Sequence, residues 1–185
     1  MARRRGSNAG LISAALSFLR KANKRNRPGR LPAEQRDHLF RGKVAPTGHP
    51  RVVGYHYRPG GRDFPDRRVV PGSINRPTAG GPYEAKPQIL DRSVNPPVWR
   101  NKTSNGGYST FFPDHWTPAQ VDAAIPGAFA RSTPVPAGTP GGTPALWRGE
   151  YRGVQIEGWY LKDANGHFVT DSAGNKVPGN GWPLL

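Results

Sequence analysis

Alternating hydrophobic and polar residues predict three β-strands in this chain. The pattern occurs in RVVGYHYR (51–58), YEAKPQI (83–89) and YRGVQIEGWYL (151–161). Pro87 has no backbone N–H for a ladder hydrogen bond, so it restricts the second strand to a sheet edge or a bulge. After the third stretch, KDANGHFV contains Asn165-Gly166, a pair typical of a hairpin turn.

Helical signals are fewer than strand signals. The clearest is TPAQVDAAIPGAFA (117–130), where Thr117 suits the N-cap and Pro118 suits the first helical position. Pro126 is expected to kink or end this helix because it cannot donate a backbone hydrogen bond. We interpret AEQRDHLFRGKV (33–44) as a short helix that runs into a strand.

Long irregular connections separate the predicted elements, and no internal repeat is evident. The 185 residues include 24 Gly and 21 Pro, and residues 59–82 and 132–144 are mostly loop-forming. Only 35% of the residues are hydrophobic, but 5 Trp, 6 Tyr and 7 Phe can bury a large apolar area. The sequence therefore predicts an α+β domain with antiparallel strands, few helices and long Gly/Pro-rich loops. We place this domain at residues 34–185, after a basic segment and linker at 1–33.

The N-terminal segment superficially resembles a signal peptide. Its apolar run, residues 11–19, is short, contains two serines and is followed by Arg20-Lys21 instead of a cleavage site. The run fits a short amphipathic helix better. It is also too short to span a bilayer, so we expect no stable membrane insertion.

The charge of the chain indicates a polyanionic partner. The net charge is +15, and the sequence pI is near 11.1. Basic surfaces of this kind attract nucleic acid, anionic membranes or acidic proteins, and we favour nucleic acid over a tail that only aids solubility. Residues 1–30 contain nine Lys or Arg and no acid, so the rest of the chain carries a net charge of only about +6.

The absence of cysteine excludes disulfide bonds, thiolate nucleophiles and cysteine-ligated zinc. It also suits a protein that crosses between compartments of different redox state. The histidines, at positions 38, 49, 56, 115 and 167, show no recognisable metal-ligand spacing. We therefore expect no metal and no cofactor.

Histidine and lysine can nevertheless cleave RNA. Two histidines can transfer protons to and from the ribose 2′-OH and the leaving 5′-oxygen, while a lysine stabilises the phosphorane. His38 and His56 lie in predicted strands among aromatic and basic residues, where aromatic rings can stack bases and Arg58 and Arg62 can contact phosphate. By spacing alone, a histidine is more often a surface or packing residue than a catalytic one.

Three sequence blocks resemble the bacterial EndoU nuclease domain. They are STFFPDHW (109–116) before the predicted helix, the GVQIEGW strand, and the terminal GWPLL. The family typically has a lysine before S-T-F-F-P, a G-V-x-I-x-G strand and a final T-x-Y-P. DHLFRGKV and GYHYRPGG occupy the places of its two histidine elements, so the resemblance covers about residues 36–185.

The resemblance implies two small antiparallel sheets around a cleft, as in RNase A-like and EndoU-like enzymes, with the helix packed outside. It implies a metal-independent or weakly metal-dependent endoribonuclease, often uridine-preferring, that leaves a 2′,3′-cyclic phosphate. His38 and His56 would be the acid–base pair and Lys102 the phosphate-stabilising cation. Ser109 and Thr110 would lie near the bound base.

The chain departs from the family pattern around its lysine and its second histidine. Tyr57 stands where the family often has a second, paired histidine. The insert TSNGGY separates Lys102 from Ser109 more than is usual, so Lys86 is a rival for the lysine role.

The terminal motif also differs. The expected T-x-Y-P becomes Asn180-Gly181-Trp182-Pro183. Trp182 can stack on a base, and Asn180 can donate and accept hydrogen bonds. Thr170 is the alternative candidate for the threonine role.

We expect the aromatic residues of STFFPDHW to be core anchors for the helix and Glu157 to be structural. The resemblance favours a toxin module that is secreted or delivered into a target-cell cytoplasm. It would act as a monomer on RNA, with tRNA a candidate, and an acidic immunity protein would cover its cleft. We expect His56 to be the base and His38 the acid. The main alternative is a noncatalytic RNA-binding protein.

Overall fold

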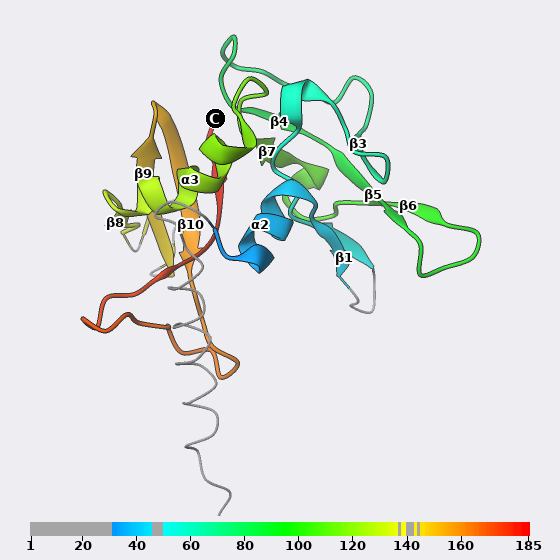
Figure 1. Cartoon of the computed structure of the whole chain (residues 1–185). Helices are drawn as coiled ribbons and strands as arrows, with labels where there is room; N and C mark the ends of the chain where they lie inside the picture. The colour runs from blue at the N-terminus through cyan, green and yellow to red at the C-terminus, as the bar shows by residue number, and fades with distance from the viewer. Residues whose placement is uncertain (1–30, 46–49, 137, 140–142, 144) are drawn as a thin grey trace, which may run out of the picture.

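The computed structural model describes residues 31–45, 50–136, 138–139, 143 and 145–185 (Figure 1). Within these residues there are two α-helices, α2 (Ala33–Phe40) and α3 (Pro118–Phe129). The strands are β1 (Lys43–Ala45), β2 (Arg51–Val53), β3 (Arg67–Val69), β4 (Tyr83–Ala85), β5 (Pro87–Asp91), β6 (Val98–Asn101), β7 (Ser109–Phe111), β8 (Thr133–Pro134), β9 (Leu146–Tyr151), β10 (Val154–Tyr160) and β11 (Pro178–Pro183). The expected amphipathic helix at 11–19 lies outside the described residues.

The described strands form four small sheets in which every pair is antiparallel. Their orders are β1-β2, β4-β7, β3-β5-β6 and β11-β10-β9-β8. The α+β class with antiparallel sheets is therefore confirmed, with the strands divided among four sheets instead of two.

Helix α3 begins as its sequence predicts. The Thr117 hydroxyl accepts the backbone N–H of Gln120, and the Gln120 side chain accepts the backbone N–H of Thr117, which is a complete capping box. Pro126 lies inside the helix and does not end it, since the helix continues to Phe129.

The hairpin of β9 and β10 corrects the predicted strand at 151–161. Arg152 and Gly153, with φ of 51° and 78°, form the turn, so Tyr151 ends one strand and Val154 begins the next. Positive φ at both turn positions matches the right-handed twist of the two strands. Arginine rarely adopts this conformation, so Arg152 gave no indication of a turn. The alternation of hydrophobic and polar residues also continues across it.

Of the other two predicted strands, one is shorter than expected and one is divided. The first ends at Val53 because Gly54 and Tyr55 have φ of 74° and 64°, which is left-handed backbone. The second becomes β4 and β5, which belong to different sheets. The edge or bulge expected for Pro87 is wrong: β5 is the central strand of its sheet, and Pro87 is tolerated there as its first residue.

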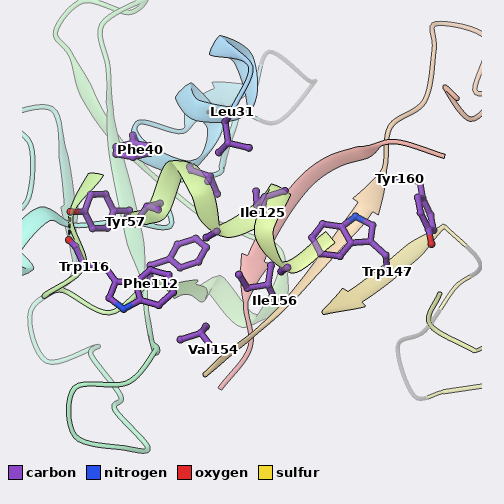
Figure 2. Packing of buried hydrophobic residues seen from close by; sticks show 14 residues of the cluster. Leu31, Phe40, Tyr57, Phe112, Trp116, Ile125, Trp147, Val154, Ile156 and Tyr160 are labelled. Carbon is purple, nitrogen blue, oxygen red and sulfur yellow. Dashed lines mark hydrogen bonds between the residues drawn. The ribbon is translucent and has the colours of Figure 1, made fainter. Parts of the chain in front are cut away.

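The aromatic block STFFPDHW joins two hydrophobic clusters. Phe111 stacks on Tyr83 in a cluster with Tyr55, Val69 and Ala85, with a centroid distance of 5.1 Å. The next residue, Phe112, stacks on Trp116 in the larger cluster around α3, as Figure 2 shows. The three aromatics of the block are at most 6% exposed, so the predicted core position is confirmed.

The larger cluster holds α3 against the four-stranded sheet. Its members include the helix residues Val121, Ala124, Ile125 and Ala128 and the sheet residues Trp147, Val154, Ile156 and Tyr160 (Figure 2). Each fully buried aliphatic side chain of valine or isoleucine size contributes about 1.5–3 kcal/mol. The helix therefore fixes β10 and β11, which carry one wall of the site described below.

Residues 161–177 form an arm of turns between β10 and β11 (Figure 1, orange). Leu161, Val169 and Val177 are joined in a ring of three backbone hydrogen bonds of 2.9–3.1 Å. Two similar turns follow, in which Asp163 and Asp171 each accept two backbone N–H groups. The turn at Asn165-Gly166 is confirmed, and D-x-x-G at 163 and 171 is a short repeat missed in the sequence.

Candidate active site

A cavity of about 570 Å³ lies where α2, β7, β10 and β11 meet. We call it the histidine cavity. Its lining includes His38, His56, Lys102, Tyr108, Ser109, Thr110, Glu157, Trp159, Asn180 and Trp182. The structure thus brings together seven of the eight residues proposed from the sequence, the exception being Arg58.

The two histidines are held together by backbone contacts between α2 and the segment after β2. The last carbonyls of a helix lack intrahelical partners. Here the His38 carbonyl accepts the N–H of Tyr55 at 2.8 Å, and the Leu39 carbonyl accepts the N–H of His56 at 2.7 Å. The imidazole ring centroids are consequently only 5.4 Å apart.

Gly54 permits this approach. A Cβ atom at position 54 would lie 2.3 Å from the His38 carbonyl oxygen, and the residue has φ of +74°. Both conditions exclude a side chain without local rearrangement. The structure also corrects the strand assignment of the histidines, because His38 is on α2 and His56 is in the irregular segment that docks on it.

His56 is buried and has a defined tautomer. Its Nδ1 lies 2.7 Å from the carbonyl oxygen of Thr110, which can only accept, so Nδ1 carries the proton. In the neutral ring this leaves a lone pair on Nε2. Burial lowers the pKa of His56 to about 3, with help from the positive charges of His38 and Lys102 and against the hydrogen bond to Thr110.

His38 has a less buried but similar environment. Burial lowers its pKa to about 4, and the charges of Lys102 and Lys43 act in the same direction. Both imidazoles are therefore neutral at pH 7 before an anion enters the cavity.

Lys102 follows β6 and lines the cavity with both histidines. Burial, and then the charge of Arg51, lowers its pKa. The rival Lys86 is outside this lining: its Nζ lies 5.0 Å from the centroid of the Tyr108 ring, in an adjoining hollow. The geometry therefore favours Lys102 for contact with a group bound between the histidines.

Ser109 and Thr110 lie side by side on β7 at the cavity wall. The Ser109 hydroxyl is buried and has no hydrogen-bond partner among the described residues. A buried hydroxyl without a partner is costly, and it is available to a ligand.

Asn180 and Trp182 are on β11 and line the cavity, whereas Thr170 is exposed in the arm, opposite Lys176. Trp159 of β10 stands beside Trp182, with ring centroids 6.1 Å apart, and is 43% exposed. Sequence reasoning missed Trp159, although the alternation in β10 places it on the same outward face as Glu157. Glu157 forms an ion pair of 2.7 Å with Arg148 at the cavity wall.

Arg58 does not reach the histidine cavity. Its Nε donates to Asp63 at 2.7 Å, its Nη1 lies 3.3 Å from the Tyr83 hydroxyl, and the residue is 7% exposed. The guanidinium of Arg58 is thus occupied and buried, and the structure places it outside the group of residues that line the histidine cavity.

The remaining histidines are elsewhere. His115 is exposed at the start of α3, His167 is exposed in the arm, and His49 lies outside the described residues. In the described part of the chain, no group of three His, Asp or Glu residues could hold a metal ion. Within the same residues, no helix is both long enough and apolar enough to cross a membrane.

Comparison with known proteins identified one family. The family model described as bacterial EndoU nuclease matches residues 32–171. The match includes α2, the segment after β2, the residue after β6 and β7, which supply the two histidines, Lys102 and Ser109, and it also includes α3 and β10. Searches of curated proteins and of solved structures gave no match.

Proposed function

The chain belongs to the bacterial EndoU nuclease family, and from this premise we propose that it cleaves RNA by attack of a ribose 2′-OH on the adjacent phosphorus. The observation that carries this proposal is the placement of His38 and His56, 5.4 Å apart, in one cavity with Lys102. Two imidazoles at this separation can reach the two apical oxygens of a single phosphate.

His56 is the general base in the proposed reaction. Its Nδ1 is committed to the Thr110 carbonyl, so Nε2 is free to accept the 2′-OH proton. A bond forms between the 2′-oxygen and phosphorus, while the bond from phosphorus to the 5′-oxygen breaks. His38 donates a proton to that 5′-oxygen, which gives a 2′,3′-cyclic phosphate and a free 5′-OH.

Lys102 stabilises the negative charge that develops on the phosphorane. The bound phosphate also changes His38, since its negative charge opposes the effect of Lys102 and Lys43 on the pKa of that residue. Substrate binding therefore favours the imidazolium form that a general acid requires.

The nucleobase on the 5′ side of the scissile phosphate would bind against β7, β10 and β11. Trp182 and Trp159 offer aromatic surface for stacking, and the Ser109 hydroxyl, the Thr110 side chain and the Asn180 amide offer hydrogen bonds. A pyrimidine, with uridine as the first candidate, suits this combination of one stacking wall and a few polar groups.

We also propose that the chain is the toxin module of a secreted or contact-delivered system, acting on tRNA or other RNA in the target-cell cytoplasm. The net charge of +15 supports a polyanionic target, and the lack of cysteine suits transit between redox environments. The partner would be an acidic immunity protein that covers the histidine cavity of the monomer.

The test is incubation of the purified chain with bulk tRNA in EDTA. Wild type should yield fragments with 2′,3′-cyclic phosphate ends, and His38→Ala and His56→Ala should each lower the rate at least about 10³-fold, since both proton transfers are needed. His115→Ala, at an exposed site outside the cavity, is the matched control. Cleavage by both single variants at the wild-type rate would refute the assignment, and shifted but intact RNA would indicate a binding protein.

A further inference from the structure

A second cavity, of about 690 Å³, adjoins the histidine cavity at His38, which lines both. We call it the α2 cavity, because Glu34 and Asp37 of that helix form one wall. Arg41, the residue that caps the end of α2, and Lys43 of β1 also line it. His38, Val53 and Asn180 line both cavities, so the proposed general acid stands at their junction.

The geometry of the proposed reaction determines which side of the scissile phosphate each cavity faces. In an in-line displacement, the attacking 2′-oxygen and the leaving 5′-oxygen lie on opposite sides of phosphorus. His56 serves the attacking side and lines only the histidine cavity, whereas His38 serves the leaving side and faces both cavities. The chain beyond the leaving oxygen must therefore continue past His38.

We propose that the α2 cavity binds the nucleotide on the 3′ side of the scissile phosphate and that Arg41 and Lys43 contact the next phosphate along the RNA. This inference rests on the proposed function. It orders the substrate across the protein, with the 5′-side base against Trp159 and Trp182 and the leaving nucleotide between α2 and β1.

The charges of the α2 cavity fit a nucleotide better than a bare anion. Lys43 is exposed, and Arg41 has a side chain 59% exposed with only a long contact of 3.8 Å to Asp66. Arg67 is already engaged, because it is paired with Asp66 and donates to the Arg41 carbonyl.

The acidic wall supplies complementary acceptors. Glu34 and Asp37 would repel a phosphate but can accept hydrogen bonds from a base amino group or a ribose hydroxyl. A cavity of this volume, lined by both cations and carboxylates, has room for a nucleoside as well as its phosphate.

The test uses oligonucleotides with a single ribonucleotide, so that cleavage occurs at one position. One series ends in a methyl ester of the ribonucleotide 3′-phosphate and has no downstream nucleoside. A second series carries two deoxynucleotides after the scissile phosphate. A third series is the methyl ester with two additional deoxynucleotides at its 5′ end. Each is prepared with all four bases at the ribonucleotide, and kcat/KM is measured for the full-length chain.

Wild type should cleave the downstream-extended substrate faster than the methyl ester. Lys43→Gln and Arg41→Gln should each reduce this ratio about tenfold, the value expected for the loss of one charged phosphate contact. Neither should change the ratio for 5′ extension. Arg131→Gln, an exposed change outside both cavities, should change neither ratio, and thermal unfolding checks that each variant is folded.

The outcomes separate this inference from the function on which it rests. If wild type cleaves none of the substrates or bulk tRNA, the nuclease assignment fails. If it cleaves them but downstream extension has no effect, or if Lys43→Gln and Arg41→Gln leave the downstream ratio unchanged, the α2 cavity is not the leaving-nucleotide site. A change in the 5′-extension ratio in these variants would reverse the assigned direction of the RNA.

Discussion

At the residue scale, the location of His38 and His56 has two opposing effects, because it suits the binding of an anion but disfavours the protonated form of both rings. Proximity to Lys102 places them where a phosphate can bind, but burial and the lysine charge lower the pKa of both rings. The hydrogen bond from Nδ1 to the Thr110 carbonyl fixes the tautomer of His56 and leaves the lone pair of Nε2 outside this contact. In the proposed reaction the neutral His56 accepts the 2′-OH proton, and the negative charge of the bound phosphate favours the protonated form of His38.

The lowered pKa values predict an acid-sensitive fold. A solvated histidine, as in the unfolded chain, has a pKa of 6.5, whereas the folded protein lowers the pKa of His38 to about 4 and that of His56 to about 3. Below pH 6.5 the unfolded state therefore binds more protons, so the free energy of unfolding should fall as the pH drops. Above pH 7 both rings are neutral in either state, and they contribute no pH dependence.

Urea unfolding between pH 7 and pH 5 measures this effect. Wild type should lose roughly 1–2 kcal/mol per histidine across that interval. His38→Asn and His56→Asn should each make the pH dependence shallower. The interval avoids the carboxylates Asp66 and Asp91, whose pKa values are lowered from 3.8 by hydrogen bonds and arginine neighbours. Identical slopes in wild type and both variants would show that the rings are not buried in the neutral form.

At the element scale, the site depends on how α2 meets the segment after β2. The two backbone hydrogen bonds from Tyr55 and His56 to the end of α2 set the spacing of the histidines. Gly54 is the position that allows this contact, since it combines left-handed backbone with direct apposition to the His38 carbonyl.

Gly54→Ala should therefore damage both stability and activity. We expect a loss of about 2–4 kcal/mol in the free energy of unfolding, from the unfavourable φ and from the displacement of α2. The rate of RNA cleavage should fall further than the folded fraction, because the histidines move apart. Gly72→Ala is the matched control: it has the same φ of +74° but open space around the added Cβ. An equal loss in the two variants would mean that only backbone strain matters at position 54.

The elements that the sequence predicted well are those determined by neighbouring residues. Thr117, Pro118 and Gln120 lie within one turn, so the start of α3 could be predicted from local chemistry. The end of β2 could not, since Tyr55 adopts positive φ in order to dock on α2, which is a tertiary interaction. The turn at Arg152 has no glycine or asparagine at its first position, and the alternation alone did not reveal it.

The same distinction applies to the candidate site. The order of motifs suggested His38, His56 and Lys102, but only the packing of β5, β6 and β7 separates Lys102 from Lys86. The pairing of Arg58 with Asp63 was not predicted, because the loop-forming residues between them indicate a turn but not which side chains it brings together. Trp159 was missed because it becomes part of the site only through its contact with Trp182, which is on another strand.

At the scale of the whole molecule, the two hydrophobic clusters meet at consecutive residues. Phe111 belongs to the cluster with Tyr55 and Tyr83, and Phe112 belongs to the cluster around α3. The backbone N–H of Phe112 donates to the His56 carbonyl at 2.8 Å, so the segment that carries His56 is tied to the junction of the clusters. Movement of one cluster against the other would therefore alter the histidine cavity directly.

Much of the positive charge and the hydrophobic core lie in different parts of the chain. Residues 1–30 contain nine Lys or Arg and no acid, while the buried clusters and the histidine cavity are built from residues 31–185. We therefore propose that the N-terminal segment adds nonspecific RNA affinity and leaves the chemistry to the nuclease domain. Each phosphate contact that it makes steepens the salt dependence of binding.

A chain that begins at residue 31 tests this division and keeps Leu31, which is 5% exposed in the larger cluster. Its kcat on saturating RNA should match the full chain, because every proposed catalytic side chain is present. Its affinity for RNA should be weaker at low salt, and the slope of log K against log salt should be shallower by about 0.7 for each lost phosphate contact. A full-length variant with all nine basic residues of 1–30 changed to Gln should behave in the same way, because its length is unchanged and only the charge is removed. Equal salt slopes in all three proteins would place RNA affinity in the nuclease domain alone, and a loss of kcat on truncation would mean that residues 1–30 contribute to the active site.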